Sequence, residues 1–314
     1  MKNKVYSCPS TQQKNRRRTT KPWGETMRLA TSIAMFVAFC VPAAALAEGR
    51  DNRAWQNQFG LAPIYTLNAR NVQGVTVNLS HEDFDNVRIE EAEDFDGATQ
   101  TAELIIPFGE RKRWEIRLEV PFHTDGNART VDGGRSIDID GNGGVFDFAT
   151  LVVQRELSTT ENCAVNSSVY FGFGYRTKEL KTDIDDKYNH RGRMVRLGGN
   201  LDNARADNDL RLQATADLRY YFDIDDLNPS SPSSSFTMLD VSGALVYNAD
   251  FAIKPGFEVL YSTDFDERQI VQVVPELILP IADWLEIKGA YAYGHSRGEG
   301  SVQTLTLRTT VSFL

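Results

Sequence analysis

Apolar and polar residues alternate along much of this chain, and the alternation is most regular at its end. Residues 304–314 read T-L-T-L-R-T-T-V-S-F-L, so that Leu305, Leu307, Val311 and Phe313 fall in step with one another. Successive side chains of a β-strand point to opposite faces. This stretch therefore predicts a strand with one apolar and one polar face.

A second stretch, residues 113–123, indicates which face is packed. Its polar face carries four charged residues in succession, Arg113, Glu115, Arg117 and Glu119. Burying unpaired ions in a dry protein core is very costly, so this charged face cannot be packed in such a core. The apolar face must be the packed one, either against lipid or against a second sheet.

Apart from residues 113–123, ten stretches show the pattern of a strand, and the last of them contains the terminal alternation. They are residues 72–81, 98–108, 145–157, 164–177, 208–222, 236–248, 251–263, 270–281, 284–295 and 302–313. Strands of roughly 10 to 13 residues suit a tilted crossing of a bilayer. They are longer than the strands usual in globular sheets.

The connections between these stretches fall into two classes. Those at residues 109–112, 158–162, 248–250 and 282–283 are short, whereas those at 82–97, 124–144 and 178–207 are long, polar and acidic. Outer-membrane barrels have short periplasmic turns and longer external loops, so the asymmetry favours an all-β, transmembrane antiparallel barrel. With only eleven strands, an odd number, the short connections would lie at both ends of the barrel instead of at one end. Residues 190–201 are therefore predicted to add a strand, for a total of about twelve.

An export signal precedes the strands. Residues 27–47 combine Arg28, an apolar run over residues 33–41 and a small-residue exit at Ala45-Leu46-Ala47. This composition predicts a signal peptide cleaved before Glu48, with an apolar run too short to be a transmembrane helix. Residues 1–47 are assigned to the signal peptide. Within them, residues 1–26 are an extended basic n-region or translation from a misassigned start.

The chain after this signal is strongly acidic. Residues 1–47 hold eight Lys and Arg and one acid, which leaves 26 basic and 42 acidic residues and a formal charge of −16. This balance argues against a nucleic-acid partner. Cys163 is the one cysteine after residue 47, so no internal disulfide is expected. Residues 48–71 are expected to form a periplasmic lead-in or a plug, and residues 72–314 the barrel.

Two hairpins look alike and place Trp114 and Trp284 beside a short turn, where an interfacial aromatic girdle would lie. Together with G-V-F-D-F at residues 144–148, they resemble outer-membrane barrels of the phenol-degradation MetA-pathway type and related proteobacterial families. The last strand resembles the final strand of bacterial outer-membrane barrels, which the insertion machinery reads; here it ends in Phe313 and Leu314. The resemblance implies an outer-membrane channel for small, often hydrophobic compounds.

The polar strand faces predict a lumen lined by charges of both signs. The candidates are Glu103, Glu115, Arg117, Glu119, Asp147, Arg155, Arg211, Asp217, Arg219, Lys254, Glu258, Glu276, Glu286, Lys288 and Arg308. The balance of signs favours charge pairs over strong ion selectivity. A barrel of about twelve strands lies between filled eight-stranded and water-filled sixteen-stranded barrels, so a narrow pore is expected. Alternatively, the pairs only stabilise the interior.

One loop carries oxygen ligands at alternate positions, Asp138, Asp140 and Asn142, as in the first half of a calcium loop. The twelfth position, which needs a bidentate acid, is Ala149, so an acidic external loop is the other interpretation. No other cofactor is expected. An enzyme is not expected either, because lipid-modifying barrels use a His and a Ser two residues apart, whereas His295 and Ser296 are adjacent.

We therefore expect an outer-membrane barrel that lets a small solute, such as a hydrophobic or aromatic compound, pass passively. Its partners would be outer-membrane lipid, the barrel-assembly machinery and the solute. A non-conducting structural or adhesion barrel, a lipid-modifying enzyme and a soluble periplasmic β-sandwich are the alternatives. The sequence leaves the solute, the bore and the oligomeric state open.

Overall fold

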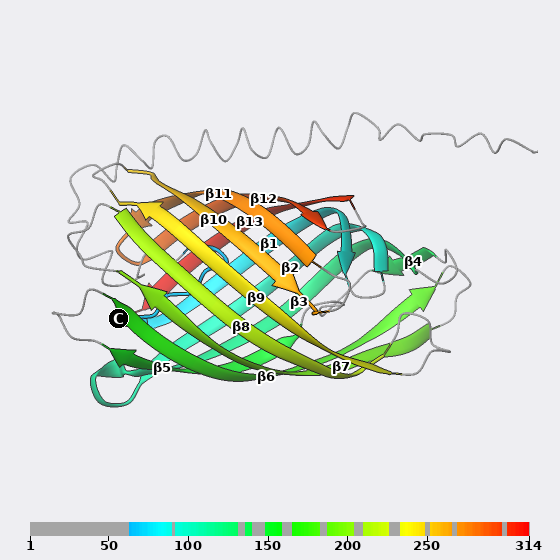
Figure 1. Ribbon diagram of the computed structural model, residues 1–314, viewed down its shortest axis with the longest axis horizontal. Coiled ribbons are helices and arrows are strands. Elements are labelled where there is room, and N and C mark those ends of the chain that lie inside the picture. The colour runs from blue at the N-terminus through cyan, green and yellow to red at the C-terminus, as the bar shows by residue number, and fades with distance from the viewer. Residues whose placement is uncertain are drawn as a thin grey trace, which may run out of the picture. The chain divides into compact units, whose positions relative to one another are not determined.

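Long antiparallel β-strands close into one barrel in the computed structural model (Figure 1), which describes residues 63–89, 92–130, 136–139, 148–158, 165–182, 187–203, 210–225, 233–248, 252–265, 269–296 and 300–313. The long strands are β1 (Val75–Ile89), β2 (Ala92–Phe108), β3 (Trp114–Thr130), β5 (Ala149–Ser158), β6 (Asn166–Thr182), β7 (Lys187–Asp202), β8 (Leu210–Ile224), β9 (Ser234–Tyr247), β10 (Lys254–Thr263), β11 (Gln269–Ala282), β12 (Leu285–Ser296) and β13 (Gly300–Phe313). The ring follows chain order and closes where β1 pairs with β13.

One further strand, β4 (Ser136–Ile139), is short and shares a place in the ring with β5. Both pair with β3 on one side and with β6 on the other, β4 near the end of β3 and β5 near its start. The ring therefore has twelve positions. The predicted all-β, antiparallel barrel of about twelve strands is confirmed.

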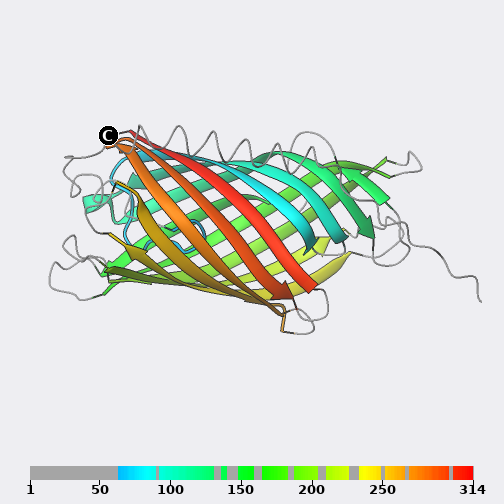
Figure 2. The same ribbon diagram turned by 90° about the horizontal axis from the view of Figure 1, so that it is seen from above.

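The start of β1 and the end of β13 lie at the same end of the barrel (Figure 2), because the ring has an even number of positions. The turns β2–β3 and β11–β12 also lie at this end, which we call the turn side. The opposite end is the loop side.

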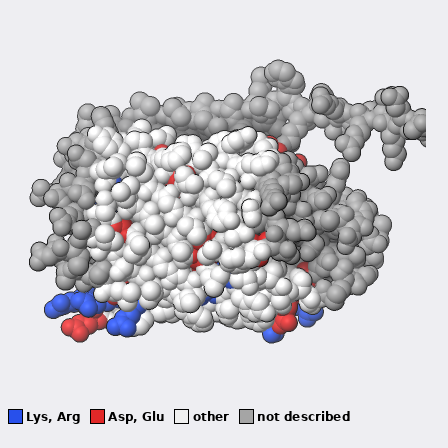
Figure 3. All heavy atoms as spheres, viewed as in Figure 1, with Lys and Arg blue, Asp and Glu red and all other residues white. Residues whose placement is uncertain are grey.

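The wall of the barrel exposes apolar side chains and buries polar ones. In β8, for example, Leu212 and Leu218 are exposed, whereas the alternating Gln213 and Asp217 are buried. Figure 3 shows one side of this wall, where the described surface is largely uncharged. An apolar band around a closed barrel is the surface that lipid requires, so this is a barrel of the outer membrane. Among the described residues, no helix has the length and apolar character needed to cross a membrane.

The predicted strands are all present, including the weakly patterned residues 190–201, which lie in β7. The predicted loops at residues 82–97, 124–144 and 178–207 were too long. Only residues 90–91 separate β1 from β2, and β3 continues to Thr130. Alternation stops before the strands do, because beyond the lipid both faces of a strand can meet water and neither needs apolar side chains.

The two tryptophans of the predicted girdle lie on the outer face. Trp114 begins β3 and is 37% exposed, and Trp284, just before β12, is 55% exposed. Both are at the turn side. This position suits the interface between lipid and water, where amphipathic rings are enriched.

Deleting Phe313 and Leu314 is expected to reduce the amount of assembled barrel severely. Phe313 stands opposite Val75 at the closing seam, so the deletion removes a rung of the ring as well as the predicted insertion signal. Heat-modifiable gel migration of membrane fractions measures the assembled form, with Phe313→Tyr as the control that keeps an aromatic ring. Assembly at the parental level after the deletion would show that the terminal strand does not direct insertion.

Candidate functional site

Residues 63–72 precede β1 and lie inside the barrel; we call them the inner segment. Ile64, Thr66 and Ala69 are at most 2% exposed, and the segment contains no helix or strand. It meets Glu115 at the start of β3 and Asp202 at the end of β7, both near the turn side. The inner segment therefore occupies the turn-side part of the lumen. Residues 48–62 of the predicted lead-in or plug lie outside the described residues.

Two carboxylates bind the N–H groups at the start of the inner segment. Glu258 of β10 accepts hydrogen bonds from the N–H groups of Ile64 and Tyr65 at 3.1 Å each and from that of Thr66 at 2.7 Å. Glu276 of β11 also accepts from the Ile64 N–H, at 3.1 Å. These two carboxyl groups therefore accept the N–H groups of three successive residues.

The carbonyl group of Ile64 is bound by a cation. Arg308 of β13 donates from Nη1 to this oxygen at 2.9 Å and from Nε to Ser80 Oγ at 3.0 Å. Gly256 makes room for the acidic partner, because a Cβ there would lie 2.1 Å from Glu276 Oε1. The backbone of Ile64 is thus held on both sides by side chains from β10, β11 and β13.

The rest of the inner segment is attached in the same manner. Three more of its backbone N–H groups donate to the wall: Leu67 to Thr215 Oγ1 at 3.0 Å, Ala69 to Asp202 Oδ2 at 3.0 Å and Val72 to Glu115 Oε2 at 2.8 Å. Burial raises the pKa of the Tyr65 phenol, which stays neutral and shares a 2.6 Å hydrogen bond with Thr306. The wall supplies side chains for every one of these contacts.

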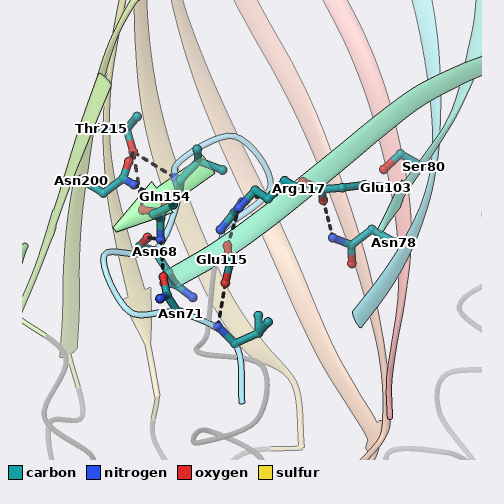
Figure 4. A network of polar contacts seen from close by, with 12 residues as sticks. Asn68, Asn71, Asn78, Ser80, Glu103, Glu115, Arg117, Gln154, Asn200 and Thr215 are labelled. Carbon is teal, nitrogen blue, oxygen red and sulfur yellow. Dashed lines mark hydrogen bonds and ion pairs between the residues drawn. The ribbon is translucent and has the colours of Figure 1, made fainter. Parts of the chain in front are cut away.

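A network of neutral side chains joins the inner segment to the middle of the wall (Figure 4). Gln154 donates from Nε2 to Asn71 Oδ1 at 3.0 Å and accepts from Asn200 Nδ2 at 3.0 Å. Thr215 in turn donates to Asn200 Oδ1 at 2.9 Å. Buried polar groups that are all paired in this way rigidify the interior instead of destabilising it.

Charge pairs cover the lumen wall beyond the inner segment. Asp217 of β8 lies 2.6 Å from Arg196 Nη2 and 2.7 Å from Arg219 Nε, and Arg219 also reaches Asp240 at 3.1 Å. On β3, Arg117 lies 2.6 Å from Glu115 and 3.8 Å from Glu103. The described residues thus form ion pairs of opposite sign on the inner wall, and their role in a pore stays a prediction.

An apolar cluster also faces inward, toward the loop side. It consists of Phe148, Met194, Tyr221 and Ile224, each less than 9% exposed. The rings of Phe148 and Tyr221 lie 5.5 Å apart edge to face, and the Arg176 guanidinium lies 4.6 Å from the Phe148 ring centre. Further buried apolar groups surround Val274 and Val302, but this cluster places aromatic rings next to a cation.

The charge pairs and the apolar cluster meet at a cavity of about 370 Å³. The inner segment contributes Ile64 and Tyr65 to its lining, and the apolar cluster contributes Phe148 and Tyr221. The opposite wall is formed by polar side chains of β1 and β2, among them Asn78. The cavity can therefore accept a small molecule that has both an apolar face and a polar edge.

The structure brings most of the predicted lumen residues together inside the barrel. Those that line the cavity are Glu103, Arg117, Glu119, Asp217, Arg219, Glu286, Lys288 and Arg308. Those buried elsewhere in the interior are Glu115, Arg211, Lys254, Glu258 and Glu276. Whether ions or solutes pass them stays a prediction.

The prediction for Arg155 was wrong. In β5 the inward side chains are Val152 and Gln154, and Arg155 is exposed on the outer face, where its guanidinium lies 5.1 Å from the Trp114 ring centre. A cation is tolerated there because the side chain lies near the end of the strand, where it can reach water and stack on an aromatic ring.

The candidate calcium loop is not tested. Asp138 is described only in its backbone, as part of β4, and Asp140, Asn142 and Asp147 lie outside the described residues. Within the described part of the chain, no group of three or more His, Cys, Asp or Glu side chains is placed to hold a metal ion.

Substituting Gly198 by Ala is expected to lower the free energy of unfolding by about 1–3 kcal/mol, as overpacking a filled interior does. A Cβ at Gly198 would lie 2.2 Å from Tyr170 Cζ, which is buried against β7. Gly243→Ala is the matched control, because nothing lies within 4 Å of a Cβ there. Urea titration in lipid vesicles measures both. Equal stability of the two variants would contradict this packing.

The comparisons with known proteins agree with the barrel. No protein-family model matches the chain, and no curated protein does. An outer-membrane channel from Pseudomonas putida F1 superposes with a TM-score of 0.56 at 12% identity, covering 81% of this chain and 100% of the channel. The translocator domain of the autotransporter NalP from Neisseria meningitidis superposes with a TM-score of 0.52 at 12% identity, covering 87% and 97%.

These two structures differ in what their names describe, one a channel and the other a translocator domain. At such low identity the likeness concerns the fold alone. The chain is similar to both and shares with them the architecture of an outer-membrane β-barrel.

Proposed function

We propose that this protein is an outer-membrane channel for the passive passage of a small solute with an aromatic or other hydrophobic part. The observation that carries the proposal is the cavity inside the closed barrel, where inward-facing Phe148, Met194 and Tyr221 lie beside the charge pairs of Arg196 and Arg219. Aromatic and apolar side chains that line part of a cavity with polar groups around them favour a ligand that has an apolar part.

The chemistry of the cavity supports this class of solute. A ring can stack against Phe148 and Tyr221, whose own contact shows the edge-to-face arrangement that aromatic pairs prefer. A polar substituent can reach the hydroxyl and amide groups on the opposite wall. The resemblance to barrels of the phenol-degradation MetA-pathway type points to the same class and is part of the proposal.

Planar-bilayer conductance of the mature chain tests the proposal, using protein that shows heat-modifiable gel migration. Discrete current steps that a small aromatic compound reduces at millimolar concentration are expected. Tyr221→Ala should weaken this reduction about tenfold, since loss of an aromatic contact is worth about 0.5–1.5 kcal/mol beyond buried area. The control Tyr220→Ala changes the neighbouring ring, which is exposed on the outer face. Silence from correctly folded protein would refute the channel.

A non-conducting structural barrel is the second candidate, and the seated inner segment is the observation that favours it. An enzyme and a soluble sandwich are not proposed. The insertion machinery, the signal peptide and calcium remain predictions from the sequence.

A further inference from the structure

The inner segment is bound inside the barrel but takes no part in the hydrogen bonding of its β-sheet. Outside the strands, none of the backbone-to-backbone hydrogen bonds found among the described residues involves residues 63–72. The segment is held instead by wall side chains, chiefly Glu258, Glu276, Asp202 and Glu115. Its removal would therefore break no rung of the β-ladder that closes the ring.

The acceptors on the wall follow the bent path of the inner segment. They bind its N–H groups first from β10 and β11 at residues 64–66, then from β8 at Leu67, from β7 at Ala69 and finally from β3 at Val72. None of these hydrogen bonds uses a side chain of the inner segment. These acceptors therefore recognise the polypeptide backbone, and we call them the backbone seat.

We propose that the backbone seat is a binding site for a peptide backbone, that the inner segment is its resident ligand, and that departure of this ligand opens the turn-side part of the lumen. The inference rests on the proposed channel function and adds to it what controls passage. A solute that enters the cavity from the loop side reaches Ile64 and Tyr65, so that the inner segment is the obstacle between the cavity and the turn side.

A cross-link between the segment and the wall tests the proposal. Thr66 Oγ1 donates to Ser242 Oγ at 2.9 Å, so cysteines at the two positions place their sulfur atoms close to bonding distance. In a Cys163→Ser background, the oxidised Thr66→Cys/Ser242→Cys protein should show large openings at least tenfold less often than its reduced form. Reductant should restore them within one recording.

The control is the Thr66→Cys single variant in the same background, which should respond to neither oxidant nor reductant. If the cross-linked protein, verified by its mass, opens as often as the reduced protein, the inner segment does not control passage and the proposal is overturned. Because one protein sample provides both states, a folding defect cannot produce the expected difference.

Thiol labelling separates this inference from the channel itself. Thr66 is fully buried, so a cysteine at this position reacts with a membrane-impermeant maleimide only when the segment leaves its seat. Labelling of folded protein in vesicles supports an exchangeable segment even if no current is seen, in which case only the proposed function fails. Absence of labelling in a protein that does conduct refutes the exchange and leaves the channel intact.

Glu258→Gln should speed labelling of Thr66→Cys at least tenfold, because the carboxyl group accepts three N–H groups through its two oxygens and an amide has only one oxygen. Glu103→Gln is the matched control. Glu103 accepts a hydrogen bond from Asn78 and pairs with Arg117, and neither of these contacts involves the inner segment. Equal labelling rates for the two variants would show that the carboxylates do not hold the segment.

Discussion

Replacing Asp217 by Ala is expected to lower the free energy of unfolding by about 3 kcal/mol, the lower end of the range for breaking a buried ion pair. The carboxylate accepts from Arg196 and Arg219 at 2.6 and 2.7 Å, and its side chain is only 3% exposed. Its loss leaves two guanidinium groups facing each other across the gap. The lower end applies because Arg219 keeps Asp240 and is 31% exposed to the lumen.

Urea titration in lipid vesicles measures this loss, and Asp223→Ala is the matched control. Asp223 pairs with Arg193 at 3.1 Å on the loop side, where both side chains are more than half exposed. Exposed pairs contribute about 0.2–1 kcal/mol, so this variant should unfold nearly as the parent does. If both variants lost a similar amount of unfolding free energy, burial of the Asp217 ion pairs would not contribute to stability.

Replacing Arg117 by Glu is expected to make the channel strongly cation-selective. Arg117 lines the cavity between Glu103 and Glu119, so its reversal changes the local charge by two units and leaves only acids there. A unit charge about 7 Å from an ion in water contributes about 0.6 kcal/mol, and two units therefore about 1.2 kcal/mol. The change stabilises a cation and destabilises an anion by this amount, so the ratio of cation to anion permeability should rise by about 2.4 kcal/mol, or roughly fifty-fold.

The reversal potential in a tenfold salt gradient measures this ratio. Arg155→Glu provides the control, because it makes the same change on the outer face, beside Trp114. If Arg117→Glu assembles poorly, Arg117→Gln should shift the potential in the same direction by about half as much. An unchanged potential in folded protein would remove Arg117 from the conducting path.

The strands could be predicted from the sequence because lipid on one side and water on the other impose a strict alternation. Residues 208–222 show it, and β8 has the expected faces. The prediction failed where the constraint weakens. Beyond the lipid, β3 continues through polar residues, and near the turn side Arg155 is stable on the outer face next to Trp114.

The inner segment could not be placed from its composition. Much of its attachment is through backbone N–H groups, which every residue other than proline carries, so these contacts leave no side-chain pattern that marks residues 63–72 as a ligand. The neutral network of Gln154 and Asn200 was missed for a related reason. Uncharged amides such as Gln154, which donates to Asn71 of the inner segment, are not marked by the charge pattern that predicts the lumen residues.

The inner segment is joined to β1 by only two residues, Gln73 and Gly74. Such a short tether gives it an effective concentration on the order of millimolar at its own seat. An intrinsic dissociation constant of about 0.1 mM would then keep the seat about nine-tenths occupied, and weakening it about tenfold would leave the seat half empty. A solute that competes weakly for the seat would thus suffice to change the open fraction of the barrel.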